Sequence, residues 1–445
     1  MPLGINERRP NANDIVVGVD VGTSKVAAVV GKWSEYDKIS IIGAAMTECK
    51  GAERGEITDI NATVRKLDEA VKLAAQQAAV EVKSIHAGVG GAHIHYKTAT
   101  HIITNNHGGY ISKQDVERLT DEVYKFDSSG ERVILHVVPQ YFEVDGQKNI
   151  KDPTGMEGLR LAGQFLVVKA DTPPTRHVYT CFNHARLEVK DLIAQPLASA
   201  YSTLTDEERE AGVCLVDVGA GTTDVAIYSD GLLRHVAVIP FGGAVVTKDV
   251  MRACGVTILA AEKLKTQYGA AVVTPRMEME RVAIASESHP KREIHRTILV
   301  EAIRCRMWEI AAQVAKEIDV AGFGRSLPTG IVLTGGGSLL PGAADLFSEV
   351  TCCDVRLGRP TVLLGKGLSQ EVSHPSYSTA IGLVAYGLHH APSPKLPFAN
   401  RKIEPEAEVH GQQSVAAKPA ENKGILGKIK NIFDSTLKEA HDLID

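Results

Sequence analysis

Residues 15–31 read IVVGVDVGTSKVAAVVG, and residues 213–229 read VCLVDVGAGTTDVAIYS. Each stretch is an apolar strand that ends in Asp-Val-Gly, followed by small hydroxyl residues and a second apolar strand. The pattern predicts a β-hairpin with glycines at its tip, where the backbone can take a positive φ and no side chain keeps a ligand away. Because the pattern occurs twice, about 200 residues apart, it predicts a duplicated domain with a cleft between the halves.

The polar residues at the two predicted tips suit a polyphosphate with a metal ion. Asp20 and Asp217 stand at strand ends, where a carboxylate can hold a hydrated divalent cation, typically Mg²⁺. Two such hairpins facing each other would hold a polyphosphate from both sides. A third glycine turn lies in GIVLTGGGSLLPG (330–342), after another apolar strand. Its backbone could approach a base or an α-phosphate closely, although a tight strand–helix connection would use the same glycines.

Composition describes an ordinary globular chain. Its 445 residues allow about three folding units, and an apolar content of 44% is enough for a sizeable core. The net charge of −5 disfavours a grip on nucleic acid, which needs an excess of basic groups. No run of eighteen apolar residues and no apolar signal-peptide core is present, so a cytoplasmic location is expected. The seven scattered cysteines form no CxxC pair, which fits a reducing compartment.

Strand and helix patterns alternate along the chain. Strands are predicted over 15–20, 25–33 and 39–48, and an amphipathic helix over 59–80. The segment 133–146 is predicted to be a pair of strands with a turn. It belongs to a block of different texture, about 87–168, that is interpreted as a small inserted α+β unit.

The end of the chain changes character. Residues 391–423 are rich in proline and lack an apolar period, so they are predicted to be a solvated linker. Residues 424–445 form an amphipathic helix pattern, with four lysines against one aspartate over 423–438, a local balance of +3. The apolar stripe contains Ile425, Leu426, Ile429, Ile432, Phe433 and Leu437, and Lys428 and Lys430 lie beside it. Such a helix could pack on protein, or it could lie on an anionic membrane, each lysine adding about 1 kcal/mol.

The segments Asp20–Lys25, Asp217–Asp224 and Gly335–Gly337 together resemble the nucleotide site of the superfamily of actin, sugar kinases and heat-shock chaperone ATPases. IAQPLASAYS (193–202) and STAIGLVAYG (378–387) resemble the two connecting helices that cross behind its cleft. Within the superfamily, the order of the parts is similar to the bacterial cell-division family FtsA. Four parts carry this similarity: the inserted block, the segment AEKLKTQYG (261–269), the linker and the terminal helix. The segment 261–269 is similar to the one that contacts adenosine in the superfamily.

The resemblance implies an α/β fold with two duplicated actin-like, ribonuclease H-like halves. The implied subdomains are 1A (14–86, 169–211 and the closing helix 371–390), the inserted 1C (87–168), 2A (212–243 and 306–370) and 2B (244–305). The linker (391–423) and a membrane-targeting helix (424–445) would follow.

The resemblance also implies ATP and Mg²⁺ as ligands. Asp20 and Asp217 would hold Mg²⁺ through water. Gly22, Thr23, Ser24 and Lys25 would contact the β- and γ-phosphates, with Gly219, Gly221, Thr222 and Thr223 as the opposite clamp. Glu262 and Lys265 would bound the adenosine, with Gly335, Gly336, Gly337 and Ser338 against it. Gln195 stands where relatives place a water-orienting Gln or Glu. An amide orients water but is a poor base, so at most a slow ATPase is expected.

The implied role is that of an adaptor that anchors FtsZ filaments to the membrane and helps assemble the division septum ring. Subdomain 2B would bind the C-terminal peptide of FtsZ. The basic side chains that suit such a carboxylate-bearing partner are Lys291, Arg292, Arg296, Arg304 and Arg306. Copies of the chain would join head to tail into a filament, which an open heterologous contact allows. The protein would lie peripherally on the cytoplasmic side of the membrane at the division site, bound to anionic lipid, and later division proteins could bind subdomain 1C.

Three alternatives remain open within the superfamily. A sugar or metabolite kinase would need an acidic base for a substrate hydroxyl, and no clear substrate motif is present. An actin-like type IV pilus adaptor of the PilM kind usually lacks the long linker and a membrane helix of its own. A chaperone ATPase would carry a substrate-binding β domain after the ATPase half.

Overall fold

The computed structural model describes residues 14–34, 38–105, 109–127, 130–284, 292–324, 327–365, 367–368 and 370–390. These residues belong to one compact unit. The predicted linker and terminal helix, with the apolar and lysine side chains expected to meet a membrane, lie outside the described residues. In the part of the chain that is described, no helix has the length and apolar character to cross a bilayer.

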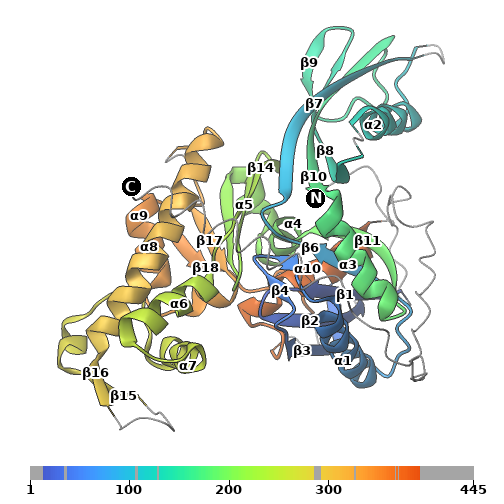
Figure 1. The fold of residues 1–445 in the computed structure, drawn as a ribbon. Coiled ribbons are helices and arrows are strands. Elements are labelled where there is room, and N and C mark those ends of the chain that lie inside the picture. The colour runs from blue at the N-terminus through green and yellow to red at the C-terminus, as the bar shows by residue number, and fades with distance from the viewer. Residues whose placement is uncertain are drawn as a thin grey trace, which may run out of the picture. The chain divides into compact units, whose positions relative to one another are not determined.

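Two five-stranded sheets of the same topology form the two halves (Figure 1). The first has the order β11-β6-β1-β2-β3 and the second β14-β13-β12-β17-β18. In each, an antiparallel three-strand meander is extended by two parallel strands, so the duplication predicted from the sequence is confirmed. The strands of the first sheet are β1 (Ile15–Val21), β2 (Lys25–Trp33), β3 (Ile39–Glu48), β6 (Ser84–Val89) and β11 (Glu188–Ala194). Those of the second are β12 (Val213–Val218), β13 (Thr223–Ser229), β14 (Leu232–Ile239), β17 (Ile331–Thr334) and β18 (Val355–Leu357).

Helices pack against both sheets. In the first half they are α1 (Ile60–Ala78), α3 (Thr172–His184), α4 (Gln195–Thr203), α5 (Asp206–Ala211) and α10 (Ser378–His389). In the second half they are α6 (Gly243–Cys254), α7 (Ile258–Tyr268), α8 (Arg296–Val320) and α9 (Ala343–Thr351). Three short 3₁₀ turns also occur, η2 (Pro275–Met279), η3 (Gly336–Leu339) and η4 (Pro375–Tyr377).

The two connecting helices, α4 and α10, cross closely behind the cleft. A Cβ atom at Gly382 of α10 would lie 1.7 Å from the carbonyl oxygen of Ala198 in α4, so only glycine fits at the crossing. These helices contain the two segments, 193–202 and 378–387, that resemble the connecting helices of the superfamily.

The insertion is a four-stranded antiparallel sheet, in the order β7-β10-β8-β9, with one helix. Its elements are β7 (Ile94–Thr104), α2 (Lys113–Asp127), β8 (Arg132–Val144), β9 (Gln147–Ile150) and β10 (Arg160–Asp171). The predicted strand pair over 133–146 is wrong, because β8 is one continuous strand. Pro139, which lacks an N–H group, is accommodated where the register against β10 shifts at Phe165, so the strand continues without a turn.

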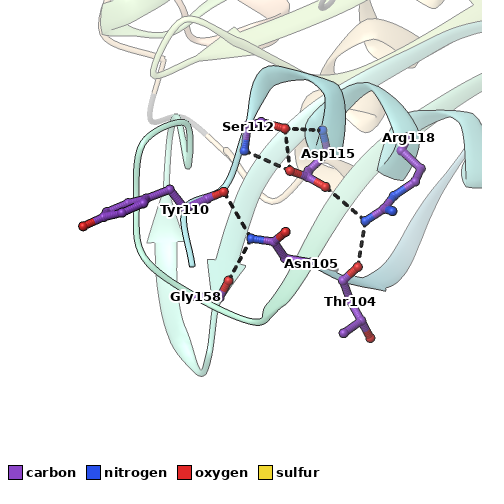
Figure 2. Close-up of polar contacts among 7 residues, drawn as sticks. All are labelled: Thr104, Asn105, Tyr110, Ser112, Asp115, Arg118 and Gly158. Carbon is purple, nitrogen blue, oxygen red and sulfur yellow. Dashed lines mark hydrogen bonds and ion pairs between the residues drawn. The ribbon is translucent and has the colours of Figure 1, made fainter. Parts of the chain in front are cut away.

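A polar cluster closes the end of the insertion far from the sheets of the two halves (Figure 2). The amide of Asn105 donates to the carbonyl groups of Tyr110 and Gly158, at 3.1 and 3.2 Å. Arg118 donates to the carbonyl of Thr104 and to the carboxylate of Asp115. The cluster satisfies loop carbonyls, of which the Gly158 carbonyl is bonded in a buried position, and this lowers the cost of removing that group from water.

Core packing joins the insertion to both halves. One apolar cluster contains residues of the first sheet, of β12–β14 of the second sheet, and of β8 (133–138) and β10 (166–170) in the insertion. A second cluster lies between the other face of the second sheet and helices α6 to α9. Helix α8 runs without a break through residue 305, where the sequence placed a subdomain boundary. Two small hairpins complete the fold, β4 (Ala52–Glu53) with β5 (Glu56–Ile57) and β15 (Arg281–Ile284) with β16 (Arg292–His295).

Candidate functional site

A cavity of about 460 Å³ lies between the two glycine-tipped hairpins. It is lined by residues of both hairpins, both connecting helices, α7 and the third glycine turn. Of the residues predicted for the site, those that line the cavity are Asp20, Gly22, Thr23, Ser24, Lys25, Gln195, Asp217, Gly219, Gly221, Thr222, Glu262, Lys265 and Gly335–Gly337. Thr223 and Ser338 do not line it, because their buried hydroxyl groups donate to the carbonyls of Phe241 and Gly335.

The first aspartate is held by the predicted water-orienting residue. Asp20 is buried on β1, and the side-chain nitrogen of Gln195, the first residue of α4, donates to its Oδ1 at 2.8 Å. Glycine makes room for this amide, since a Cβ atom at Gly90 would lie 1.7 Å from Gln195 Oε1. Gln195 also lines the cavity, where its amide could orient a water molecule.

The second aspartate is held by both connecting helices. The hydroxyl of Ser199 on α4 donates to Asp217 Oδ2 at 2.6 Å, and Thr379 on α10 lies 3.5 Å from the same oxygen. Ser199 and Thr379 are themselves 3.0 Å apart. Hydroxyl groups from two helices therefore fix the carboxylate of the second hairpin, and sequence reasoning assigned no role to either residue.

Burial makes charge costly in this site. Burial raises the pKa of Asp20 to about 6, although the nearby Lys25 acts to lower it. The pKa of Asp217 is also raised by burial, against the hydrogen bond from Ser199 and the charge of Lys25. Burial lowers the pKa of Lys25 in turn. Two buried carboxylates whose ionised forms are disfavoured by burial are a donor set that fits a divalent cation, because the ion would stabilise their charge.

A third carboxylate, Asp224, was missed as a site residue. It pairs in register with Asp217 across the second hairpin, and it is buried and lines the cavity. Its Oδ1 has no hydrogen-bond partner among the described residues. Burial raises its pKa well above the usual range, and the charges of Asp217 and Asp20 add to this effect. The sequence signal that could have identified Asp224 is its position in GAGTTD (219–224), directly after the two threonines.

The segment before α10 also contributes residues that the sequence did not indicate. The ammonium group of Lys25 donates to the carbonyl of Ser376. His374, Pro375 and Ser376 line the same cavity. Burial lowers the pKa of His374, and the charges of Lys25 and Arg359 add to this. The loop therefore holds the predicted phosphate-binding lysine in place with a backbone group.

The wall predicted to bound an adenosine is a polar network between α6 and α7. The ammonium group of Lys265 lies 2.7 Å from Glu262 Oε2, and it donates to the carbonyl of Gly243 at 3.1 Å and to Thr247 at 2.8 Å. Thr247 also donates to Glu262. This network fixes the start of α6 against α7, so the wall is shaped before any ligand enters.

Close backbone contacts bring the glycine loops together. A Cβ atom at Gly335, where φ is +82°, would lie 2.2 Å from Asp217 Oδ1. A Cβ atom at Gly221 would lie 2.1 Å from the hydroxyl oxygen of Thr23, which belongs to the opposite hairpin. The two hairpins thus face each other as the sequence predicted, and the third glycine turn lies against the second of them.

The basic residues considered for a peptide partner are paired within the chain where they are described. Arg296 contacts Glu280 at 2.5 Å, Arg306 contacts Asp249 at 2.6 Å, and Arg304 lies 3.8 Å from Glu301. The side chains of Lys291 and Arg292 lie outside the described residues.

Two family models match the chain. The model for "Cell division protein FtsA" matches residues 214–382, and the model for "SHS2 domain inserted in FTSA" matches residues 91–169, within the inserted sheet. The chain is 36% identical over 375 residues to the cell division protein FtsA of Pseudomonas aeruginosa, which covers 84% of this chain and 89% of that protein. It is 33% identical over 381 residues to the FtsA of Escherichia coli strain K12, with 84% and 90% covered.

Solved structures share the fold at lower identity. The PilM-PilN type IV pilus biogenesis complex matches with a TM-score of 0.61 and 17% identity, covering 84% of this chain and 98% of that one. The ethanolamine utilization protein EutJ of Carboxydothermus hydrogenoformans matches with a TM-score of 0.50 and 15% identity, covering 85% and 92%. At these identities the likeness concerns the fold, which is actin-like with two sheet-based halves.

Proposed function

Because the chain belongs to the family of the cell division protein FtsA, we propose that it is an ATP-binding, actin-like adaptor that tethers FtsZ filaments to the cytoplasmic side of the membrane at the division site. The proposal has three parts, which are nucleotide binding in the cleft, membrane binding by the terminal helix, and recruitment of FtsZ.

The observation that carries the nucleotide part is the pair of facing hairpins. Asp20 and Asp217 converge on one buried cavity beside Lys25, with the glycine loops in contact across it. In this proposal Asp20 and Asp217 would hold Mg²⁺ through water, and the ion would supply positive charge against the phosphates. The lysine and the loop N–H groups bind the β- and γ-phosphates, as donors do in other phosphate sites.

The same residues support slow hydrolysis at most. Gln195 is fixed by its bond to Asp20, so its amide is oriented before a water molecule arrives. An amide has no basic group to accept the proton of that water, and the charge on Lys25 supplies electrostatic stabilisation only. The protein therefore acts mainly through the bound nucleotide, as a structural adaptor that forms head-to-tail filaments.

The nucleotide part is tested by equilibrium binding of a fluorescent ATP analogue. We expect Mg²⁺-dependent binding that unlabelled ATP displaces, and loss of binding in Lys25→Met, which removes the ammonium group but keeps the length of the side chain. Lys72→Met on the exposed face of α1 is the matched control. Equal binding by Lys25→Met and Lys72→Met would remove Lys25 from the site.

The membrane part concerns residues 424–445, whose apolar stripe and lysines suit the headgroup layer of an anionic bilayer. We expect the full chain to sediment with anionic liposomes and to recruit purified FtsZ to them in the presence of ATP. Deletion of 424–445 should release both proteins. A second variant, Ile429→Glu/Phe433→Glu, keeps the length and places charge in the stripe. Unchanged sedimentation of both variants would contradict the membrane role.

The FtsZ part is separated by a further comparison. If the chain remains on liposomes but FtsZ stays in the supernatant, membrane binding holds and recruitment fails. Where FtsZ is recruited to the liposomes, the isolated C-terminal peptide of FtsZ is added as a competitor. An excess of peptide should release FtsZ and leave this chain on the lipid, which would identify the tail as the contact.

A further inference from the structure

The inserted sheet is joined covalently to the first half at one place. The chain leaves the first sheet through Gly90–His93 and returns through Asp171 into α3. The two crossings lie side by side, since the N–H of Asp171 donates to the carbonyl of His93 at 3.2 Å. The guanidinium of Arg132, at the start of β8, contacts the Asp171 carboxylate at 3.0 Å. We call this connection, formed by Gly90–His93, Asp171 and the first residues of β8, the root of the insertion. It is a narrow hinge that is held by several hydrogen bonds.

The same root also contacts the second half. The hydroxyl of Tyr96 on β7 lies 2.8 Å from His235 Nδ1 on β14. The side chain of Gln140 on β8 donates to the carbonyl of Leu233 at 3.0 Å and accepts from Arg234 at 3.1 Å. Strand β14 is the edge of the second sheet, so its backbone groups are open to side chains of another element. Figure 1 shows the lower part of β7 beside β14.

These contacts extend into the helices of the second half. His235 is buried, and its Nε2 lies 2.9 Å from the carboxylate of Glu317 on α8. The carboxylate favours the tautomer with the proton on Nε2, which leaves Nδ1 to accept from Tyr96. Helix α8 is bonded to α6 through Arg306 and Asp249, at 2.6 Å. Since α6 begins at the cavity, a short series of contacts links the insertion to the wall of the site.

The hinge of the insertion touches the first wall of the site as well. Gly90 makes room for the amide of Gln195, and Gly91 packs on Gly55, whose Cβ would lie 2.7 Å from the Gly91 backbone. The N–H of Gly55 donates to the hydroxyl of Thr23, which lines the cavity, at 3.1 Å. The root of the insertion is thus in contact with both halves and with residues of the candidate nucleotide site.

We propose that the insertion is a clasp across the cleft, in which the bonds of Tyr96 and Gln140 to β14 favour the closed arrangement of the two halves and respond to nucleotide. The inference rests on the proposed binding of nucleotide between the halves. A change in the angle between the halves displaces β14 relative to the hinge at Gly90–His93, so these bonds cannot stay unchanged. Because coupling between two sites is reciprocal, the bonds must also affect nucleotide affinity.

The test uses the full chain and hydrogen–deuterium exchange with and without a non-hydrolysable ATP analogue and Mg²⁺. In the wild type we expect nucleotide to slow exchange in the loops 20–25 and 217–223, and also at the clasp, in 93–97, 138–142 and 232–236. In Tyr96→Phe/Gln140→Ala we expect the loops to be protected as before, the clasp to lose its response, and the analogue to bind about 3- to 10-fold more weakly.

The matched control is Tyr110→Phe/Gln147→Ala, which makes the same two changes at exposed positions of the insertion. It should behave as the wild type. Protection of the loops without any change at the clasp in the wild type would overturn the clasp and leave nucleotide binding intact. An absence of protection in the loops themselves would instead refute the proposed nucleotide site, and the clasp with it.

A folding defect is distinguished by the single variant Tyr96→Phe, which removes one hydroxyl group and keeps the ring. Its nucleotide-free exchange pattern outside the clasp should match the wild type. If nucleotide affinity and the response of the clasp are both unchanged in Tyr96→Phe and in the double variant, the bonds to β14 carry no coupling.

Discussion

The side chain of Gln195 donates a hydrogen bond to Asp20 across 2.8 Å, and the two residues come from segments 175 positions apart. Gln195 begins helix α4 immediately after strand β11, whereas Asp20 lies near the end of β1. The bond places an amide and a carboxylate on one wall of the cavity, and it fixes the orientation of both.

Replacement of Gln195 separates hydrolysis from binding. Gln195→Leu keeps the approximate size of the side chain but cannot bond to Asp20 or orient water. We expect the rate of phosphate release to fall about 100-fold, with nucleotide affinity changed less than about threefold. Gln76→Leu, at an exposed position of α1, should leave both quantities unchanged. Equal rates for Gln195→Leu and the wild type would exclude Gln195 from the hydrolytic step.

Removal of Mg²⁺ should weaken nucleotide binding only in a chain that has both carboxylates, Asp20 and Asp217. In the wild type, chelation of Mg²⁺ should weaken nucleotide binding roughly 10- to 100-fold, because the ion neutralises the buried carboxylates and the phosphates together. Asp217→Asn keeps the bond from Ser199 but removes the charge. We expect its affinity to change little when Mg²⁺ is chelated, as measured by calorimetric titration. Asp68→Asn on the surface of α1 should retain the full Mg²⁺ effect.

The crossing of α4 and α10 should not tolerate a methyl group. Gly382→Ala would normally stabilise a helix by about 1 kcal/mol, but here the new Cβ would lie 1.7 Å from the Ala198 carbonyl oxygen. We expect a net loss of about 2 kcal/mol in the free energy of unfolding in urea. Gly130→Ala, whose Cβ would meet no atom within 4 Å, should change this free energy by less than about 0.5 kcal/mol.

Two buried histidines should make the fold sensitive to acid. Burial lowers the pKa of His390 to about 4 and that of His136 to about 3, below the ordinary value of 6.5. The unfolded chain therefore binds protons that the folded chain does not, and stability that is complete above pH 6.5 is lost as the pH falls toward 4. His390 alone should contribute a loss of a few kcal/mol, about 1.4 kcal/mol for each pH unit.

This prediction is measured with His390→Phe, which keeps a ring against Tyr386 but cannot take up a proton. Between pH 6.5 and 4, the slope of the free energy of unfolding against pH should fall by about 1.4 kcal/mol per pH unit, which is the contribution of one proton. His177→Phe makes the same substitution at an exposed position and is the matched control. An unchanged slope in His390→Phe would show that this ring is not protonated on unfolding.

Much of the fold could be predicted from the sequence because its signals are local. The strand β3 has the predicted bounds 39–48, and the helix predicted over 59–80 is α1. The first is a short, largely apolar run and the second has an amphipathic period, and the tertiary structure overrides neither. The prediction of two strands over 133–146 was wrong because a register shift against β10 lets β8 continue through Pro139 as one strand.

In the candidate site, too, local sequence signals predicted some residues and only tertiary contacts revealed others. Asp20 and Asp217 were predicted because each follows an apolar strand in a repeated motif. Asp224, Ser199 and His374 were not, because their importance depends on burial and on partners far away in the chain. No local pattern distinguishes a serine that bonds an aspartate of the other half from any serine on an apolar helix.

The sequence by itself determined the duplicated hairpins, the order of the parts and the positions of the glycines, since these depend on residue type and spacing. Only the tertiary structure decided which groups meet across the cleft, that α4 and α10 together hold Asp217, and that the insertion bonds to the edge of the second sheet. Those contacts join residues that are tens to hundreds of positions apart. They form because each buried polar group needs a partner, and the packing of the two halves determines which partner is within reach.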